Sequence, residues 1–186
     1  MTEDRRRVLY VIVCGAGPAA DVGRLIDLAH DRSRDVQLIA TPAALDFLDV
    51  PALEARTGQL VRCEYRKPGQ PRSPKADAII IAPASYNTIN KWALGISDTY
   101  ALGILAEAIG LQIPLVVLPF VNSALADRLP FRRSVRQLRD EGVRILLGPE
   151  QFEPHPPGTG GTHLDTFPWH LALDQAEQLH AQTPAL

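Results

Sequence analysis

The sequence has few cysteines and no excess of charge of one sign, and each scarcity excludes a class of protein. Cys14 and Cys63 are the only cysteines among 186 residues, and no C-x-x-C spacing links them. Such thiols predict neither a disulfide framework nor a zinc site, and they suit a reducing cytoplasm. The formal net charge of −2 gives no reason to expect nucleic acid or an anionic membrane as a partner. We therefore expect a cytoplasmic protein without a metal site.

Long hydrophobic runs are also missing, and no run approaches the length of a transmembrane helix. The arginines at positions 5–7, followed by the apolar residues 8–14, resemble a signal peptide. However, seven apolar residues are at the lower limit for such a segment, and they lead directly into an amphipathic helix. Because their removal would delete the first core strand, we interpret residues 8–14 as part of the fold.

Apolar runs alternate with helical periodicity along the chain. Residues 8–14 and 36–40 read as buried strands, and apolar residues between them recur at positions 22, 25, 26 and 29. This β-α-β order predicts a parallel sheet in a three-layer, Rossmann- or flavodoxin-like α/β fold, with residues 1–186 as a single domain. Further strands are expected at 60–65, 78–81, 114–118 and 143–147. Helices are expected at 98–110, at 130–141 and from Pro168 onward, whereas 46–56 should be helical or irregular with a break at Pro51.

The turn after the first strand contains Gly15, Ala16 and Gly17 and fits G-x-G-x-x-A, a variant of the dinucleotide fingerprint. On this motif alone, a nicotinamide-dependent dehydrogenase remains an alternative. A dinucleotide site also needs an acidic residue at the end of the second strand. That strand ends at Thr41 and Pro42, and a hydroxyl there suits a mononucleotide phosphate better. Thr41 is equally suited to cap a helix that begins at Pro42, and the two roles are compatible.

The most informative stretch is residues 82–98, A-P-A-S-x-N-T-I-N-K-x-A-x-G-I-x-D, which follows the buried strand at 78–81. We expect Pro83 to end the strand, Thr88 to cap the next helix and Gly95 to end it. Ser85, Asn87 and Thr88 would then lie at the carboxyl end of a parallel strand, where open α/β sheets bind ligands. A loop of this kind at a helix start is a natural anion site; the alternative is an ordinary strand–helix turn.

This stretch closely resembles the signature of the homo-oligomeric flavin-containing cysteine decarboxylases. That family includes phosphopantothenoylcysteine decarboxylase and the epidermin-type peptidyl-cysteine decarboxylases, and the resemblance extends over about residues 8–147. It implies FMN held at a subunit boundary in a homo-trimer or an assembly of trimers such as a dodecamer. The cofactor-binding residues that it implies are Gly15, Ala16, Gly17, Thr41, Ala82, Pro83, Ala84, Ser85, Asn87, Thr88 and Asp98.

Residues 119–126 resemble the substrate motif of the same family, P-x-M-N-x-x-M-W. Pro119 and Asn122 are kept, whereas Val121, Leu125 and Ala126 replace the methionines and the tryptophan. In the family this asparagine binds the substrate carboxylate, and the alternative for Asn122 is a turn residue after a strand. The resemblance implies an oxidative decarboxylase acting on a small thiol or a peptidyl-cysteine: flavin oxidises the thiol to a thioaldehyde, and the carboxylate leaves as CO₂.

The catalytic histidine of the family is missing from its usual place. In the family it stands fourteen residues before the motif proline, and here that position is Gly69, with no histidine between His30 and His155. Residues 148–168, rich in proline and glycine, resemble a lid over the substrate, or else form a plain linker to the C-terminal helix. His163 in this segment is the candidate base. The absence keeps open an alternative function, an FMN-binding protein without decarboxylase activity that serves as a flavin carrier or structural partner.

Overall fold

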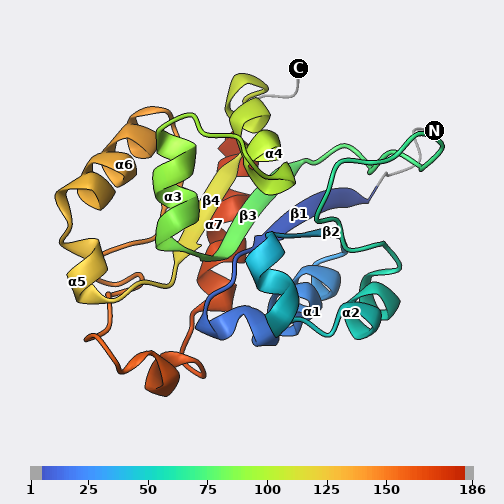
Figure 1. Ribbon diagram of the computed structural model, residues 1–186. Helices are drawn as coiled ribbons and strands as arrows, with labels where there is room; N and C mark the ends of the chain where they lie inside the picture. The colour runs from blue at the N-terminus through green and yellow to red at the C-terminus, as the bar shows by residue number, and fades with distance from the viewer. Residues whose placement is uncertain (1–5, 183–186) are drawn as a thin grey trace.

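The computed structural model describes residues 6–182, and their centre is a five-stranded parallel sheet (Figure 1). Part of the basic stretch at 5–7 lies outside the described residues. The strand order is β2-β1-β3-β4-β5, the doubly wound order in which the chain reverses direction across the sheet between β1 and β3. The strands are β1 (Arg7–Val13), β2 (Arg34–Ala40), β3 (Ala78–Ala84), β4 (Leu115–Pro119) and β5 (Arg144–Ile145).

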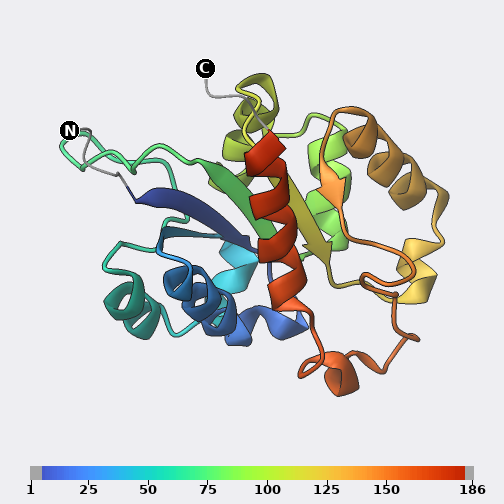
Figure 2. The ribbon, with the colours of Figure 1, turned by 180° about the vertical axis from the view of Figure 1, so that it is seen from behind.

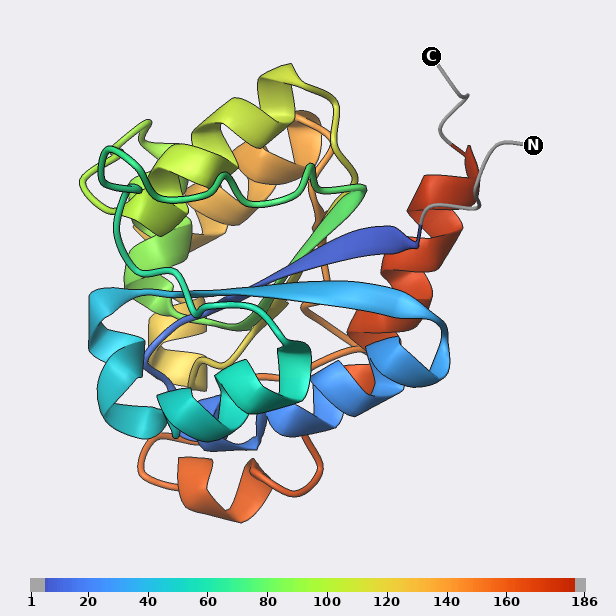
Figure 3. The ribbon, with the colours of Figure 1, turned by 90° about the vertical axis from the view of Figure 1, so that its right-hand side faces the viewer.

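Helices cover both faces of the sheet, which gives the three layers expected from the sequence. They are α1 (Gly23–Asp31), α2 (Val50–Thr57), α3 (Tyr86–Ala93), α4 (Tyr100–Gly110), α5 (Ser123–Ala126), α6 (Leu129–Asp140) and α7 (Trp169–Gln182), with 3₁₀ turns η1 (Gly17–Asp21), η2 (Pro42–Phe47) and η3 (Gly160–His163). One core cluster lies between the sheet and α1 and α7, and the other between the sheet and α3, α4 and α6. Figure 2 shows α7 across the back of the sheet, and Figure 3 shows the sheet edge-on between its helical layers.

The strands are apolar on both faces because both faces are covered. In β1, Val11 packs in the cluster with α1 and α7, whereas the adjacent Ile12 packs in the cluster with α3, α4 and α6. Both side chains are fully buried. This arrangement explains why the strands read as continuous apolar runs rather than as alternating patterns.

Three strand predictions were wrong in detail. Residues 60–65 form no strand: the backbone makes one isolated bridge, between Arg62 and Ile39 of β2, at the outer edge of the sheet. Pro83 does not end β3, which continues to Ala84. The register with β4 shifts between Ile81 and Ala84, so the missing N–H of Pro83 falls where the ladder is already interrupted. The last strand is also shorter than expected, because only Arg144–Ile145 pairs with β4.

The helix ends correct further expectations. Pro51 lies in the first turn of α2, where a proline needs no N–H partner, and so it does not break the helix. Ser85, rather than Thr88, caps α3, and Gly95 follows the helix with φ of 71°, as predicted for its end. The helix predicted at 98–110 begins later, after its cap Thr99. No helix within residues 6–182 is long and apolar enough to cross a membrane.

Candidate functional site

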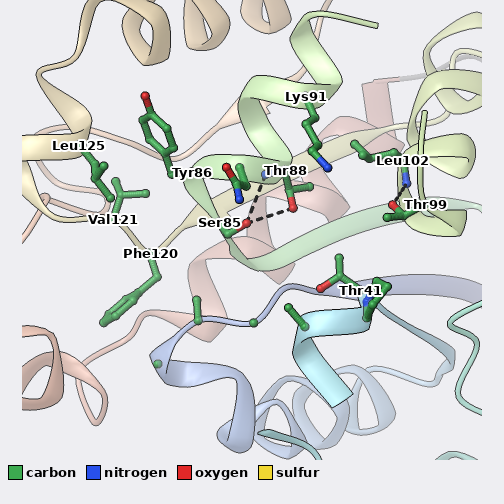
Figure 4. Close-up of a pocket in the computed structure, with 16 residues that line it drawn as sticks. Thr41, Ser85, Tyr86, Thr88, Lys91, Thr99, Leu102, Phe120, Val121 and Leu125 are labelled. Carbon is green, nitrogen blue, oxygen red and sulfur yellow. Dashed lines mark hydrogen bonds between the residues drawn. The ribbon is translucent and has the colours of Figure 1, made fainter. Parts of the chain in front are cut away.

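A cavity of about 640 Å³ opens at the carboxyl ends of the strands, beside the reversal between β1 and β3. Open α/β sheets bind their ligands at this position. The loops after β1, β2, β3 and β4 all contribute to it, so residues distant in the sequence meet there (Figure 4). It is lined by residues 15–17, 41–43 and 85–88 and by Lys91, Thr99, Leu102, Phe120, Val121 and Leu125.

Glycines allow the loop after β1 to approach its neighbours closely. A Cβ atom on Gly15 would lie 2.5 Å from the backbone oxygen of Ala43 in η2. A Cβ atom on Gly17 would lie 2.8 Å from the side chain of Leu164 and 3.0 Å from that of Phe120. A side chain at position 15 would therefore displace the loop, whereas one at position 17 would have to move the side chains of Leu164 and Phe120. Without such side chains, the bare backbone forms this side of the cavity.

Hydroxyl groups at the start of α3 form the polar part of the pocket. Ser85 Oγ accepts a hydrogen bond from the Thr88 backbone N–H at 3.2 Å, and the two hydroxyl oxygens lie 3.0 Å apart. Behind them, the buried thiol of Cys14 donates to Thr88 Oγ1 at 3.3 Å. The free backbone N–H groups of the first helical turn face the same end, which favours an anionic group there.

A lysine brings one positive charge to the pocket. Lys91 lies on α3, and its Nζ atom is 2.6 Å from the Asp98 carboxylate in the loop before α4. Asp98 does not line the cavity itself; it holds the lysine that does. Thr99, the next residue, accepts from the Leu102 backbone N–H and so starts α4 at the pocket wall (Figure 4).

The side of the pocket away from Thr41 and Thr99 is formed by Phe120 (Figure 4). The His155 ring packs against Phe120, with ring centroids 4.9 Å apart, and the His163 ring stacks on His155 at 5.5 Å. His155 is 8% exposed, and its Nδ1 lies 3.0 Å from the Pro156 carbonyl oxygen. Neither histidine lines the cavity, and Phe120, which does, is the lining residue that contacts this pair.

Asn122 has a structural task at the end of β4. Its side-chain oxygen accepts from the Leu125 backbone N–H at 2.9 Å and thereby caps α5. Its backbone also bridges to His155, and the Ser123 N–H donates to the His155 carbonyl oxygen. The turn role considered for Asn122 is therefore present, and it ties the 148–168 segment to the pocket.

The structure brings together seven of the residues chosen from the sequence: Gly15, Ala16, Gly17, Thr41, Ser85, Asn87 and Thr88 line one cavity. It does not bring Asn122 or His163 to the lining. Ala82, Pro83 and Ala84 lie in β3. The sequence analysis missed Tyr86, Lys91, Thr99 and Leu102 as lining residues, whereas Phe120, Val121 and Leu125 belong to the motif at 119–126 that it connected with the substrate. For Lys91 a signal was available, because it stands one helical turn after Thr88.

Residues 1–162 match the family model named Flavoprotein, and the chain belongs to this family. The fold resembles the FMN-dependent cysteine decarboxylase SpaF, at 25% identity and a TM-score of 0.69 over 93% of this chain and 98% of SpaF. The epidermin biosynthesis protein EpiD from Staphylococcus aureus is 26% identical, with a TM-score of 0.65 over 75% of this chain and 81% of EpiD. The FMN-binding protein AtHal3 has the same fold, at 21% identity and a TM-score of 0.67 over 87% of this chain and 95% of AtHal3.

Among curated proteins, the chain is similar to the coenzyme A biosynthesis bifunctional protein CoaBC of Thermococcus kodakarensis, with 25% identity over 154 residues. The match covers 78% of this chain and 38% of that protein. CoaBC of Haemophilus influenzae is 27% identical over 148 residues, covering 76% of this chain and 36% of the relative. The chain thus spans little more than a third of the length of these two relatives.

Proposed function

We propose that the protein binds FMN in the pocket at the carboxyl ends of β1 and β3. The observation that carries this proposal is the set of hydroxyl and backbone N–H donors at the start of α3, beside a loop whose glycines leave the backbone bare. Such donors suit a phosphate monoester. A cavity of about 640 Å³ is within the usual range of small-molecule sites. Membership of the flavoprotein family and the likeness to SpaF support the same cofactor.

Each part of the pocket has a proposed share in holding FMN. Ser85 and Asn87 would bind the phosphate, with Thr88 holding the Ser85 hydroxyl. Residues 15–17 and Thr41 would contact the rest of the cofactor from the opposite side. The end of β3, formed by Ala82, Pro83 and Ala84, leads directly into this loop and positions it. Asp98 would act through Lys91. At the end of β2, where a dinucleotide site needs a carboxylate, the chain has the hydroxyl of Thr41.

The absorbance spectrum of the purified protein, before and after addition of FMN, tests this proposal. Flavin absorbance that remains with the protein through gel filtration is the expected result, with riboflavin bound more weakly because it lacks the phosphate. The same run reports the molecular mass, for which we propose a homo-trimer or an assembly of trimers. A colourless protein that takes up no FMN would contradict the proposal, and tight binding of NAD without flavin would restore the dinucleotide alternative.

For the reaction, we propose oxidative decarboxylation of a small thiol or peptidyl-cysteine in the cytoplasm. When bound, FMN would accept the two electrons released as the thiol is oxidised. The capping bond of Asn122 uses its side-chain oxygen, which leaves its NH₂ group as a donor for the substrate carboxylate. His163, with His155 between it and Phe120, is the proposed base. Val121 and Leu125 would contact the apolar part of the substrate.

A second function has its own support, namely an FMN-binding protein without decarboxylase activity, such as a flavin carrier or structural partner. No histidine of the described residues lines the pocket, and the histidine pair is connected to it through the contact of His155 with Phe120. Incubation of the FMN-loaded protein with a cysteine-ended peptide, followed by mass spectrometry, distinguishes the two functions. Loss of CO₂ and two hydrogens supports the decarboxylase, provided that a C-terminally amidated control peptide is unchanged. An unchanged acid peptide under conditions of full FMN loading supports the second function.

A further inference from the structure

Cys14 lies directly behind the turn that opens α3, although it does not line the pocket. Its backbone N–H donates to the Pro83 carbonyl oxygen at 3.1 Å, which joins the ends of β1 and β3 and fixes the position of the residue. Its side chain is 1% exposed, and its Sγ atom donates to Thr88 Oγ1 at 3.3 Å. Burial raises the pKa of the Cys14 thiol above its usual value, so at neutral pH the sulfur keeps its proton and remains a donor.

The hydrogens of these groups can be arranged so that each one has an acceptor. A hydroxyl has one hydrogen to donate and two lone pairs that accept. The thiol hydrogen occupies one lone pair of Thr88 Oγ1. Either hydroxyl of the Thr88–Ser85 pair, whose oxygens lie 3.0 Å apart, could donate to the other, and the arrangement that we infer directs the Thr88 hydrogen to Ser85 Oγ. Ser85 Oγ also accepts the Thr88 backbone N–H. With both lone pairs occupied, Ser85 has only its own hydrogen left to offer, and this residue lines the cavity.

We propose that Cys14 is a positioning residue which, through Thr88, makes the Ser85 hydroxyl a hydrogen-bond donor to the bound ligand. The proposal rests on the proposed function, in which that ligand is FMN, and it names a phosphate oxygen as the acceptor. With the opposite direction, Ser85 would donate its hydrogen to Thr88 and present its remaining lone pair to an anion, which would repel it. The first backbone N–H groups of α3 are donors at the same end, so the oriented hydroxyl completes a set composed of donors alone.

Titration of flavin fluorescence with variants of Cys14 and Thr88 tests this role. Cys14→Ala removes the first donor, and we expect FMN affinity to fall about three- to tenfold, the size of one neutral hydrogen bond. Cys14→Ser keeps a donor of similar size and should retain the affinity. Thr88→Val removes the relaying hydroxyl with little change of shape and should lower the affinity at least as much as Cys14→Ala. Cys63→Ala, at the other free cysteine, is the matched control and should bind as wild type.

A double-mutant cycle separates positioning from a general loss of structure. Ser85→Ala should weaken FMN binding about 10- to 100-fold, because it removes a bond to a charged group. Cys14→Ala added to Ser85→Ala should then cost nothing more, and Cys14→Ala alone should leave riboflavin affinity unchanged. A Cys14→Ala protein that binds FMN as tightly as wild type, or one that loses the same factor in the Ser85→Ala background, would overturn the role of Cys14 alone. Wild-type protein that takes up no FMN would overturn the proposed function as well.

Discussion

At the scale of the residue, Gly15 sets how closely the loop after β1 approaches η2. A Cβ atom there would meet the Ala43 backbone oxygen at 2.5 Å, and backbone cannot turn aside as a flexible side chain does. We therefore expect Gly15→Ala to displace the loop, to lower the free energy of unfolding by about 1–3 kcal/mol and to weaken FMN binding by at least about tenfold. Urea unfolding and flavin fluorescence titration measure the two effects.

Gly110→Ala is the matched control for this change. A Cβ atom on Gly110 would meet no atom within 4 Å, and the residue lies within α4. Because Gly110 is the last residue of α4, alanine there gains at most the roughly 0.8–1.0 kcal/mol by which it is favoured over glycine in a helix interior. This variant should therefore be as stable as wild type or more so, with the same FMN affinity. Unchanged FMN affinity in Gly15→Ala would show that the close approach is not needed for the cofactor.

At the scale of the element, the segment 148–168 has little regular structure and is held by aromatic packing. Phe152 is buried, and its ring lies 5.7 Å from Phe120 at the pocket wall and 5.9 Å from Phe167, which in turn contacts Trp169 of α7 at 4.8 Å. We expect Phe152→Ala to destabilise the protein by about 3–5 kcal/mol. Limited proteolysis should then cleave the 153–166 region faster than in wild type.

Phe47→Ala provides the comparison, since Phe47 is 44% exposed in η2 and takes no part in this cluster. Its effect on the free energy of unfolding should stay within about 0.5 kcal/mol. If Phe152→Ala is cleaved no faster than Phe47→Ala, contacts other than the aromatic cluster hold the segment against the pocket.

At the scale of the whole molecule, cysteine and tyrosine side chains with raised pKa values make the protein less stable at alkaline pH. Burial raises the pKa of Cys14 and of Cys63 above 9.0, and that of Tyr10 and Tyr100 above 10.0. Above about pH 9 the unfolded chain therefore releases protons that the folded protein still holds. The contribution of these groups to the free energy of unfolding is complete below that pH. It is lost as the pH rises through the folded pKa values, by up to about 1.4 kcal/mol per pH unit for the fully buried Cys14 and by less for the partly exposed Cys63 and Tyr100.

Urea unfolding between pH 7 and pH 11 checks this dependence. Stability should fall from about pH 9 upward, and Cys14→Ser should reduce the steepness of the first part of the fall, because serine does not ionise in this range. Cys63→Ser should have a smaller effect, since its thiol is less buried. Parallel curves for wild type and Cys14→Ser would mean that the Cys14 thiol titrates alike in the folded and unfolded chains.

The strands and the position of the pocket were predictable because they follow from local apolar runs and from the geometry of parallel sheets. Contacts that join distant segments were not. The ring packing of Phe120 on His155 depends on how the 148–168 segment returns to β4, and no periodicity encodes that path. Residues 60–65 look like a strand because they are partly apolar. In the structure, Arg62 alone of this segment forms a bridge, with Ile39 of the outer strand β2. Pro83 was expected to end β3, but the strand continues past it because the register with β4 shifts at this point.

The position of α7 has a consequence for the order in which the protein is made. Trp169, Leu173 and Ala176 bury one face of the sheet together with α1, and α7 is the last helix along the described chain. During synthesis, strands β1 to β4 and the whole pocket leave the ribosome before the helix that covers this face. All the residues that line the pocket are thus synthesised while one face of the sheet is still open to water, and that face is covered once α7 has been made.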